Sequence, residues 1–146
     1  LLVTLGNAAF SSHPALAPLV YMRSLELSLE RQLLPEHTPM MIAAVGVLAH
    51  ALLGQVELAF TYGETAIELA NQAAFHTSSC VTLQVHGLYN HFWRKPLRET
   101  LDFFDRGIQS AHDYGNNEFV AYMSHSWSKH AFYVSIELAQ VEERCL

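Results

Sequence analysis

The chain has 146 residues, of which 51% are hydrophobic and only 15% are charged, and its formal net charge is −6 at pH 7. Because acidic residues outnumber basic ones by 14 to 8, we expect no basic face of the kind that binds nucleic acid. The two cysteines form no CxxC pair and no disulfide framework, which favours a reducing, cytoplasmic setting.

Prolines interrupt the first part of the chain. Residues 1–10 are typical of a helix end. The next helix begins near Pro18, because a proline four residues inside a helix that starts at Pro14 would clash with the preceding turn. The apolar spacing carries this helix to about Leu33, and Pro35 indicates a linker after it.

Two helices with clear boundary signals follow. Thr38-Pro39 predicts a helix start, with a capping hydroxyl and a first-turn proline, and this helix runs to about Leu53. Gly54-Gln55 breaks it, and the next helix covers 56–71. The apolar run over 39–54 spans only ~24 Å, short of the ~30 Å hydrocarbon core of a bilayer. We therefore expect a buried core helix and no membrane contact.

Four more helical patterns complete the chain. Thr77 and Ser78 offer capping hydroxyls, Pro96 is a first-turn proline, Gly115 is a helix stop, and Asn116 or Asn117 is an N-cap. These signals predict helices over 76–93, 96–114, 119–134 and 137–146. No segment alternates long enough to predict a strand, so the sequence predicts an all-α fold of about eight helices.

The helical patterns recur at a fixed distance. The second helix of each pair begins near Pro14, Gln55, Pro96 and Glu137, and each of these positions lies 41 residues after the last. Such a period predicts helix–turn–helix repeats, slightly longer than the ~34 residues of a tetratricopeptide unit. We expect one domain over 1–146, in a right-handed tetratricopeptide-like superhelix. Its units cover approximately 1–34, 38–74, 77–114 and 116–146.

Small residues mark the expected helix crossing in the second unit. They let two helices approach closely, and Gly63 lies inside a helical pattern, where it costs ~1 kcal/mol relative to alanine. We expect its reason to be a close neighbouring helix. The set comprises Ala43, Gly46, Ala59, Gly63 and Ala66.

The chain resembles the helical region of very large bacterial signalling proteins. The resemblance covers 38–146 and is carried by HFWRKPLRET at 91–100, then Gly107, Gly115-Asn116, Glu118 and Ala121-Tyr122. Those proteins join a serine/threonine kinase-like domain, a predicted AAA-type ATPase, tetratricopeptide-like helices, a GAF domain and often a histidine kinase. The resemblance implies a scaffold or sensor segment between the ATPase and the output modules. The apolar start LLVTL and the end inside a helical pattern likewise lead us to expect an excised piece of a longer protein.

Nine histidines invite a metal hypothesis, which their spacing does not favour. His76 and Cys80 are four apart and share a helical face. His86 and His91, like the pair at 125 and 130, are five apart, which is poor for joint ligation on a helix. With no HExxH and no paired-cysteine motif, we predict no metal and no cofactor, and we expect histidines that are polar handles in the core or surface residues.

The sequence predicts no catalytic site. Serines at 124, 126 and 128 alternate along a helix and point in different directions, without a GxSxG turn. Asp102 and Arg106 have the spacing of an ordinary exposed ion pair, and Cys80 is expected to be a small buried hydrophobe. No GxxxxGK[ST], HRD, DFG or GxGxxG motif is present. We therefore predict that this domain is not an enzyme.

Aromatic residues carry the functional prediction, because aromatics with a polar tip favour interfaces. If the first helix of each pair lines a concave face, the repeat phase places nine residues there: Thr82, Val85, Tyr89, Phe92, Trp93, Met123, Ser126, His130 and Tyr133. The alternative is that most of them pack in the core between units.

The predicted function is therefore a non-catalytic scaffold for protein–protein or interdomain interaction within a multidomain signalling ATPase or kinase. The partner is a protein, a peptide or a neighbouring domain of the same chain, and homo-oligomerisation stays open. The alternative is a regulatory module whose aromatic groove holds a small effector.

Overall fold

The structure is a computed structural model that describes residues 8–9, 12–13, 15–30, 36–134 and 137–145. Within these residues the chain is entirely helical, which confirms the predicted all-α class, and no strand occurs in them. Seven α-helices are present in this part, one fewer than the eight predicted. The helix end predicted over 1–10 falls largely outside the described residues.

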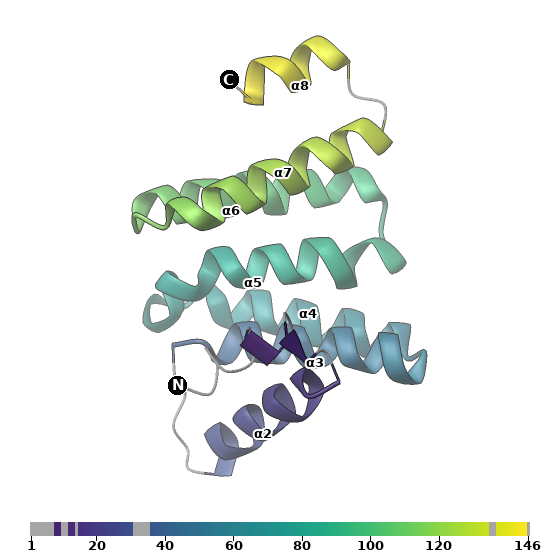
Figure 1. Ribbon diagram of the computed structural model, residues 1–146, viewed down its shortest axis with the longest axis vertical. Coiled ribbons are helices and arrows are strands. Elements are labelled where there is room, and N and C mark those ends of the chain that lie inside the picture. The colour runs from purple at the N-terminus through teal and green to yellow at the C-terminus, as the bar shows by residue number, and fades with distance from the viewer. Residues whose placement is uncertain (1–7, 10–11, 14, 31–35, 135–136, 146) are drawn as a thin grey trace.

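The helices lie in successive layers along the long axis of the molecule (Figure 1). The layers begin with α2, continue with α3 beside α4, then α5, then α6 beside α7, and end with α8. Most helices pack on their neighbours in the sequence, and α3 also contacts α5. The bounds are α2 Ala17–Glu30, α3 Thr38–Leu53, α4 Val56–Ala70, α5 Ser79–Val85, α6 Thr100–Asp113, α7 Asn117–Tyr133 and α8 Leu138–Cys145.

Small residues allow α3 and α4 to pack closely, as the sequence predicted. A Cβ at Gly46 would lie 2.9 Å from the carbonyl oxygen of Ala59, so this contact requires glycine. Ala43, Ala59 and Ala66 are fully buried. Gly54 ends α3 in the left-handed conformation with φ 67°, where glycine is favoured.

The main core lies between α5, α6 and α7. Phe104 and Met123 are fully buried there, together with Leu83 and Cys80. Burial of the Cys80 side chain also raises the pKa of its thiol, which keeps the thiol protonated and unreactive near neutral pH. The expectation that Cys80 is a small buried hydrophobe is confirmed.

The prediction of one regular helix over 76–93 is wrong. A 3-10 helix over Ala73–Ser78 precedes α5, and α5 gives way to a π-helical turn over His86–Asn90 and a 3-10 turn over His91–Trp93. The Asn90 amide donates a 3.0 Å hydrogen bond to the Ala43 carbonyl of α3, so a tertiary contact holds the turn. The following helix also begins later than predicted, because a 3-10 turn over Leu97–Glu99 precedes α6.

The predicted capping residues have different outcomes. Ser78 is the N-cap of α5, but its side chain makes no capping hydrogen bond, and its hydroxyl donates to the Glu36 carbonyl at 2.6 Å. Asn116 caps α7, with its side chain accepting a hydrogen bond from the Phe119 N–H at 3.4 Å. Thr38 is instead the first residue of α3, and His37 is the N-cap, without a side-chain hydrogen bond. The Thr38 side chain is fully buried and serves packing rather than capping.

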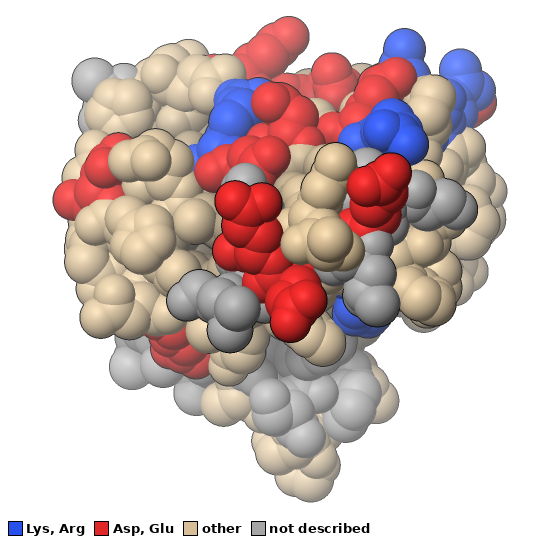
Figure 2. Space-filling model, turned by 90° about the horizontal axis from the view of Figure 1, so that it is seen from above, with Lys and Arg blue, Asp and Glu red and all other residues tan. Residues whose placement is uncertain are grey.

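Charged residues on the face at the α8 end are mixed in sign. Figure 2 shows acidic side chains crossing the middle of this face and basic ones gathered toward one edge. This face is therefore not a continuous basic surface. The predicted pair of Asp102 and Arg106 is confirmed, with 3.6 Å between the carboxylate and the guanidinium. Among the described helices, none combines the length and the apolar character needed to span a bilayer.

Candidate functional site

Two adjoining hollows form an apolar groove where α2, α3, α5 and α7 meet. Tyr21, Ala44, Val85 and Tyr89 line both of them. The smaller hollow has a volume of about 270 Å³, and its other lining residues are Ala17, Pro18, Val47 and Leu48. The larger hollow has a volume of about 560 Å³ and is also lined by Met40, Val81, Gln84, Leu88, Glu118, Phe119 and Tyr122. We call this surface the α2–α7 groove.

The nine residues predicted to line a partner surface separate into three groups. Val85 and Tyr89 line the α2–α7 groove. Trp93 and Tyr133 are exposed elsewhere, and Phe92 is half-buried. The remaining four are buried in the core and offer no surface: Thr82, Met123, Ser126 and His130.

Tertiary contacts explain why part of this set is internal. The Nδ1 atom of His130 lies 2.6 Å from the Thr100 hydroxyl, which also donates to the Leu97 carbonyl at 2.6 Å. Even Trp93, which is 49% exposed, packs on the His50 ring, with 4.2 Å between ring centroids. The repeat phase placed these residues on one helix side, but neighbouring helices cover much of that side.

The larger hollow has a polar end on α7. Glu118 and Tyr122 both line it, and the Tyr122 hydroxyl donates a 2.9 Å hydrogen bond to the Glu118 carboxylate. This hydrogen bond and the negative charge of Glu118 raise the pKa of Tyr122. Burial raises the pKa of Tyr21 on the opposite side. The groove thus combines apolar walls with one exposed carboxylate, which suits a cationic group on a ligand.

A second cluster of polar side chains lies on the other side of α5. Glu64 comes from α4, His86 begins the π turn, and His91 follows that turn directly. The His91 N–H donates to the His86 carbonyl, which closes the i→i+5 bond of the π turn. In a regular α-helix, residues five apart point about 140° away from each other. The wider π turn brings the two imidazoles toward one side.

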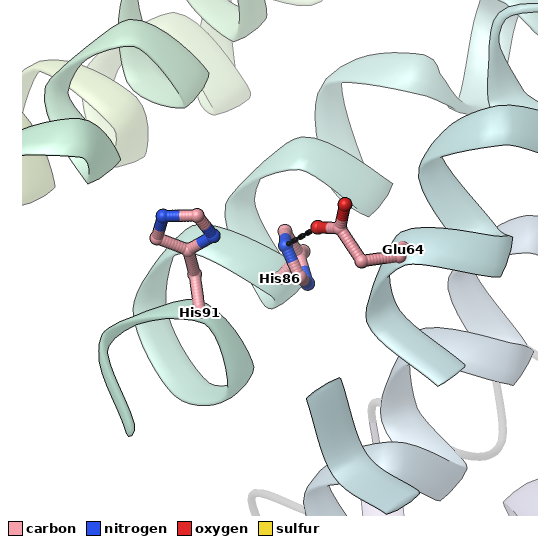
Figure 3. Close-up of side chains that lie close together, drawn as sticks. All are labelled: Glu64, His86 and His91. Atoms are coloured by element: carbon pink, nitrogen blue, oxygen red, sulfur yellow. Dashed lines mark ion pairs between the residues drawn. The ribbon is translucent and has the colours of Figure 1, made fainter. Parts of the chain in front are cut away.

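The three side chains converge in the space between α4 and the π turn (Figure 3). The His86 Nε2 atom lies 2.9 Å from a Glu64 carboxylate oxygen. One potential ligand atom from each residue lies within 4.8 Å of the other two. The His91 Nε2 atom also lies 3.3 Å from the Glu99 carboxylate. Nitrogen and carboxylate donors in this arrangement are the kind that bind transition metals.

Burial controls the charge of both imidazoles. Burial first, and then the neighbouring His91 ring, lower the pKa of His86 to about 4. Burial outweighs the half-exposed Glu64 carboxylate, which lies 2.9 Å from the His86 Nε2 atom. Burial also lowers the pKa of His91, against the opposing contact and charge of Glu99. Both rings are therefore mainly neutral near pH 7.

Aromatic rings form the walls of this cluster. Phe103 of α6 contacts both imidazoles edge-on, with ring centroids 5.0 Å from His86 and 4.8 Å from His91. Phe60 of α4 lies slightly farther away, with ring centroids 6.1 Å from His86 and 6.0 Å from His91. These walls keep water from much of the ring surface. The Glu64 and Glu99 carboxylates mark the solvent side, because both are about half-exposed.

Sequence reasoning missed this cluster because it assumed regular helical geometry through residues 86–91. One feature of the sequence did point to the cluster: Gly63 lies inside a helical pattern, and we expected a close neighbouring helix to be its reason. The structure instead places the His86 imidazole where a side chain at 63 would be. The cluster leaves two features in the sequence. One is an unexplained glycine inside a helix, and the other is a pair of histidines five residues apart in the next helical segment.

Comparison of the chain with protein-family models, with curated proteins and with solved structures gave no match.

Proposed function

We propose that this domain is a non-catalytic interaction module that binds an apolar protein segment in the α2–α7 groove. The observation that carries the proposal is the groove itself, in which apolar side chains from four helices converge around Val85 and Tyr89. Tyr89 is 44% exposed and Tyr122 is 49% exposed, so both present large aromatic surface to a partner. Aromatic side chains in such positions contribute disproportionately to binding energy.

The groove chemistry favours one class of segment. The smaller hollow accepts an apolar side chain, and Glu118 at the polar end of the larger hollow accepts a lysine or arginine. An amphipathic helix with apolar anchors one turn apart and a basic residue beyond them fits this pattern. The net charge of −6 would also attract a basic segment.

We also propose that the helices form tetratricopeptide-like pairs in a right-handed superhelix. The 41-residue spacing and the close packing of α3 with α4 support this arrangement. Within the signalling proteins that the chain resembles, the bound segment belongs to a partner protein or to a neighbouring domain of the same chain. The outer face of α2 is a second apolar surface available to such a domain, with Leu19 and Leu29 at least 60% exposed.

The test begins with a displayed library of helical peptides selected on the immobilised domain. Selected peptides are then titrated against Tyr89→Ala, Val85→Ser and the control Tyr114→Ala, which removes an equally exposed aromatic at the end of α6. We expect the two groove variants to weaken binding at least about tenfold, or 1.4 kcal/mol. Equal affinity of every variant for the selected peptides would overturn the proposal.

The smaller hollow supports the second candidate function, which is sensing of a small apolar effector. Its volume of about 270 Å³ is just below the ~300–1,000 Å³ range of ligand pockets. Its lining is apolar apart from the two tyrosine hydroxyls. In a thermal-shift screen, an effector would raise the melting temperature with concentration. Ala44→Leu, which fills the hollow, would abolish that rise.

A further inference from the structure

We propose that Glu64, His86 and His91 bind a divalent transition metal ion, Zn²⁺ by preference, between α4 and the π turn. Two imidazoles and one carboxylate are an established ligand set for zinc, with a fourth coordination position left for water. The proposal is independent of the α2–α7 groove, because none of the three residues lines it.

The distances are close to those of a coordination site. With metal–ligand bonds of about 2.0–2.2 Å, tetrahedral ligand atoms are roughly 3.3 Å apart. The 2.9 Å separation between His86 and Glu64 is already in this range. The three ligand atoms all lie within 4.8 Å of one another, so closing them onto one ion requires a movement of at most roughly 1.5 Å. The half-exposed Glu64 side chain can supply part of that movement by changing rotamer.

Glu99 completes the arrangement as an outer partner. Metal-binding histidines usually present their second ring nitrogen to a carboxylate, which fixes the tautomer and the ring orientation. Glu99 lies 3.3 Å from the Nε2 atom of His91, and this contact leaves Nδ1 for the metal. One nitrogen of the His91 ring faces the pair of His86 and Glu64 in Figure 3.

Histidines that serve only as polar handles in a core are expected to have satisfied ring nitrogens. Here the Nε2 atoms of His86 and His91 face the Glu64 and Glu99 carboxylates at 2.9 and 3.3 Å, whereas both Nδ1 atoms are buried without a hydrogen-bond partner among the described residues. Two neighbouring imidazoles in this state are costly for a purely structural role. A metal ion would satisfy one nitrogen of each ring at the same time.

The π turn is the second, independent observation that points to a ligand. Such turns are rare inside helices and occur frequently at functional sites. This one has a direct geometric effect, because its extra residue brings His86 and His91 to one side of the segment. A regular α-helix through these residues would separate the two imidazoles.

Isothermal titration of Zn²⁺ into the tag-free, metal-stripped chain tests the proposal. We expect saturable binding of one ion per chain. Loss of an outer partner typically weakens metal binding roughly 10–100-fold, and we expect a loss of this size in Glu99→Gln. Glu64→Gln and His91→Gln each remove a ligand and should weaken binding by more than that. His112→Gln and His125→Gln are matched controls, because both histidines are exposed and neither belongs to the cluster.

Co²⁺ gives a second measurement that does not depend on the heat of binding. We expect visible absorption of four- or five-coordinate Co²⁺ in the wild type and in both controls, and its loss in Glu64→Gln. Glu64 is half-exposed, so this variant should fold even if His91→Gln does not. Absence of saturable Zn²⁺ binding, or control variants that lose as much affinity as Glu64→Gln, would overturn the proposal.

Discussion

The imidazole of His86 lies over Gly63, in the space that a side chain at position 63 would occupy. A Cβ there would overlap the Nδ1 atom of His86, and that ring is enclosed by Phe103 and His91. We expect Gly63→Ala to lower the free energy of unfolding by roughly 1–3 kcal/mol, the usual cost of overpacking. Alanine would otherwise favour the helix by ~1 kcal/mol. Urea unfolding measures the net effect.

Gly107→Ala is the matched control for this prediction. A Cβ at Gly107 of α6 would meet the thioether end of Met123, which is flexible and can move aside. We expect this variant to cost less than Gly63→Ala. In a double variant that combines Gly63→Ala with His86→Ala, the alanine at 63 should no longer lower the free energy of unfolding, because the overlapping ring is gone. A penalty that persists in the double variant would show that His86 is not the cause.

The boundaries of α3 and α4 could be predicted from the sequence, whereas the π turn could not. Pro39 at the start of α3 and Gly54 at its end act through the local backbone, so the sequence contains their effect. The π turn depends on the hydrogen bond from Asn90 to Ala43, which joins residues far apart in the chain. No pattern within residues 86–91 indicates that one of them forms a hydrogen bond to a residue of another helix.

Acid should destabilise the metal-free protein through His86. Its pKa is about 4 in the folded chain and ~6.5 when unfolded. Between these values the unfolded chain binds more protons, so the free energy of unfolding falls as pH decreases from about 6.5 toward 4. The loss reaches roughly 3 kcal/mol at most. Above about pH 6.5, this residue gives no pH dependence.

Urea unfolding in the presence of a chelator, between about pH 7 and pH 4.5, measures this slope. His86→Gln removes the titrating group and should flatten the slope, whatever its effect on stability at neutral pH. His125→Gln, at an exposed position, should retain it. Identical slopes for wild type and His86→Gln would assign the acid sensitivity to other groups.

Thr100 links α6 to α7 through His130. Its hydroxyl lies 2.6 Å from His130 Nδ1 and donates to the Leu97 carbonyl, and burial lowers the pKa of His130. Thr100→Val keeps the shape but leaves the buried imidazole nitrogen without its partner. We expect a loss of about 1–3 kcal/mol in the free energy of unfolding.

Thr61→Val provides the comparison for Thr100. Thr61 of α4 is exposed, and its hydroxyl bonds only to the Glu57 carbonyl one turn earlier. Water can replace that hydrogen bond, so the free energy of unfolding should change by no more than about 0.5 kcal/mol. If both valine variants unfold at the same urea concentration as the wild type, the contact between Thr100 and His130 contributes nothing to stability.

The nine predicted groove residues show that the repeat phase predicts which side of a helix a residue lies on, but not whether that residue is exposed. The phase identifies the side of each first helix, because helical spacing determines which residues share a face. Val85 and Tyr89 lie on that side beside a groove, whereas Thr82 and Met123 are fully buried, and Met123 belongs to the core cluster that also contains Phe104 of α6. How deep each position lies depends on the neighbouring helices, which helical spacing alone does not determine.

This division predicts opposite results for two alanine substitutions in α7. Met123 is fully buried, whereas Tyr133 is 67% exposed. Met123→Ala should lower the free energy of unfolding by about 2–5 kcal/mol, through lost burial and a cavity against Gly107 and Phe104. Tyr133→Ala should change it by less than about 0.5 kcal/mol and leave the helical circular dichroism intact. A large loss in Tyr133→Ala would mean that this ring is part of the core, and it would remove Tyr133 from any partner surface.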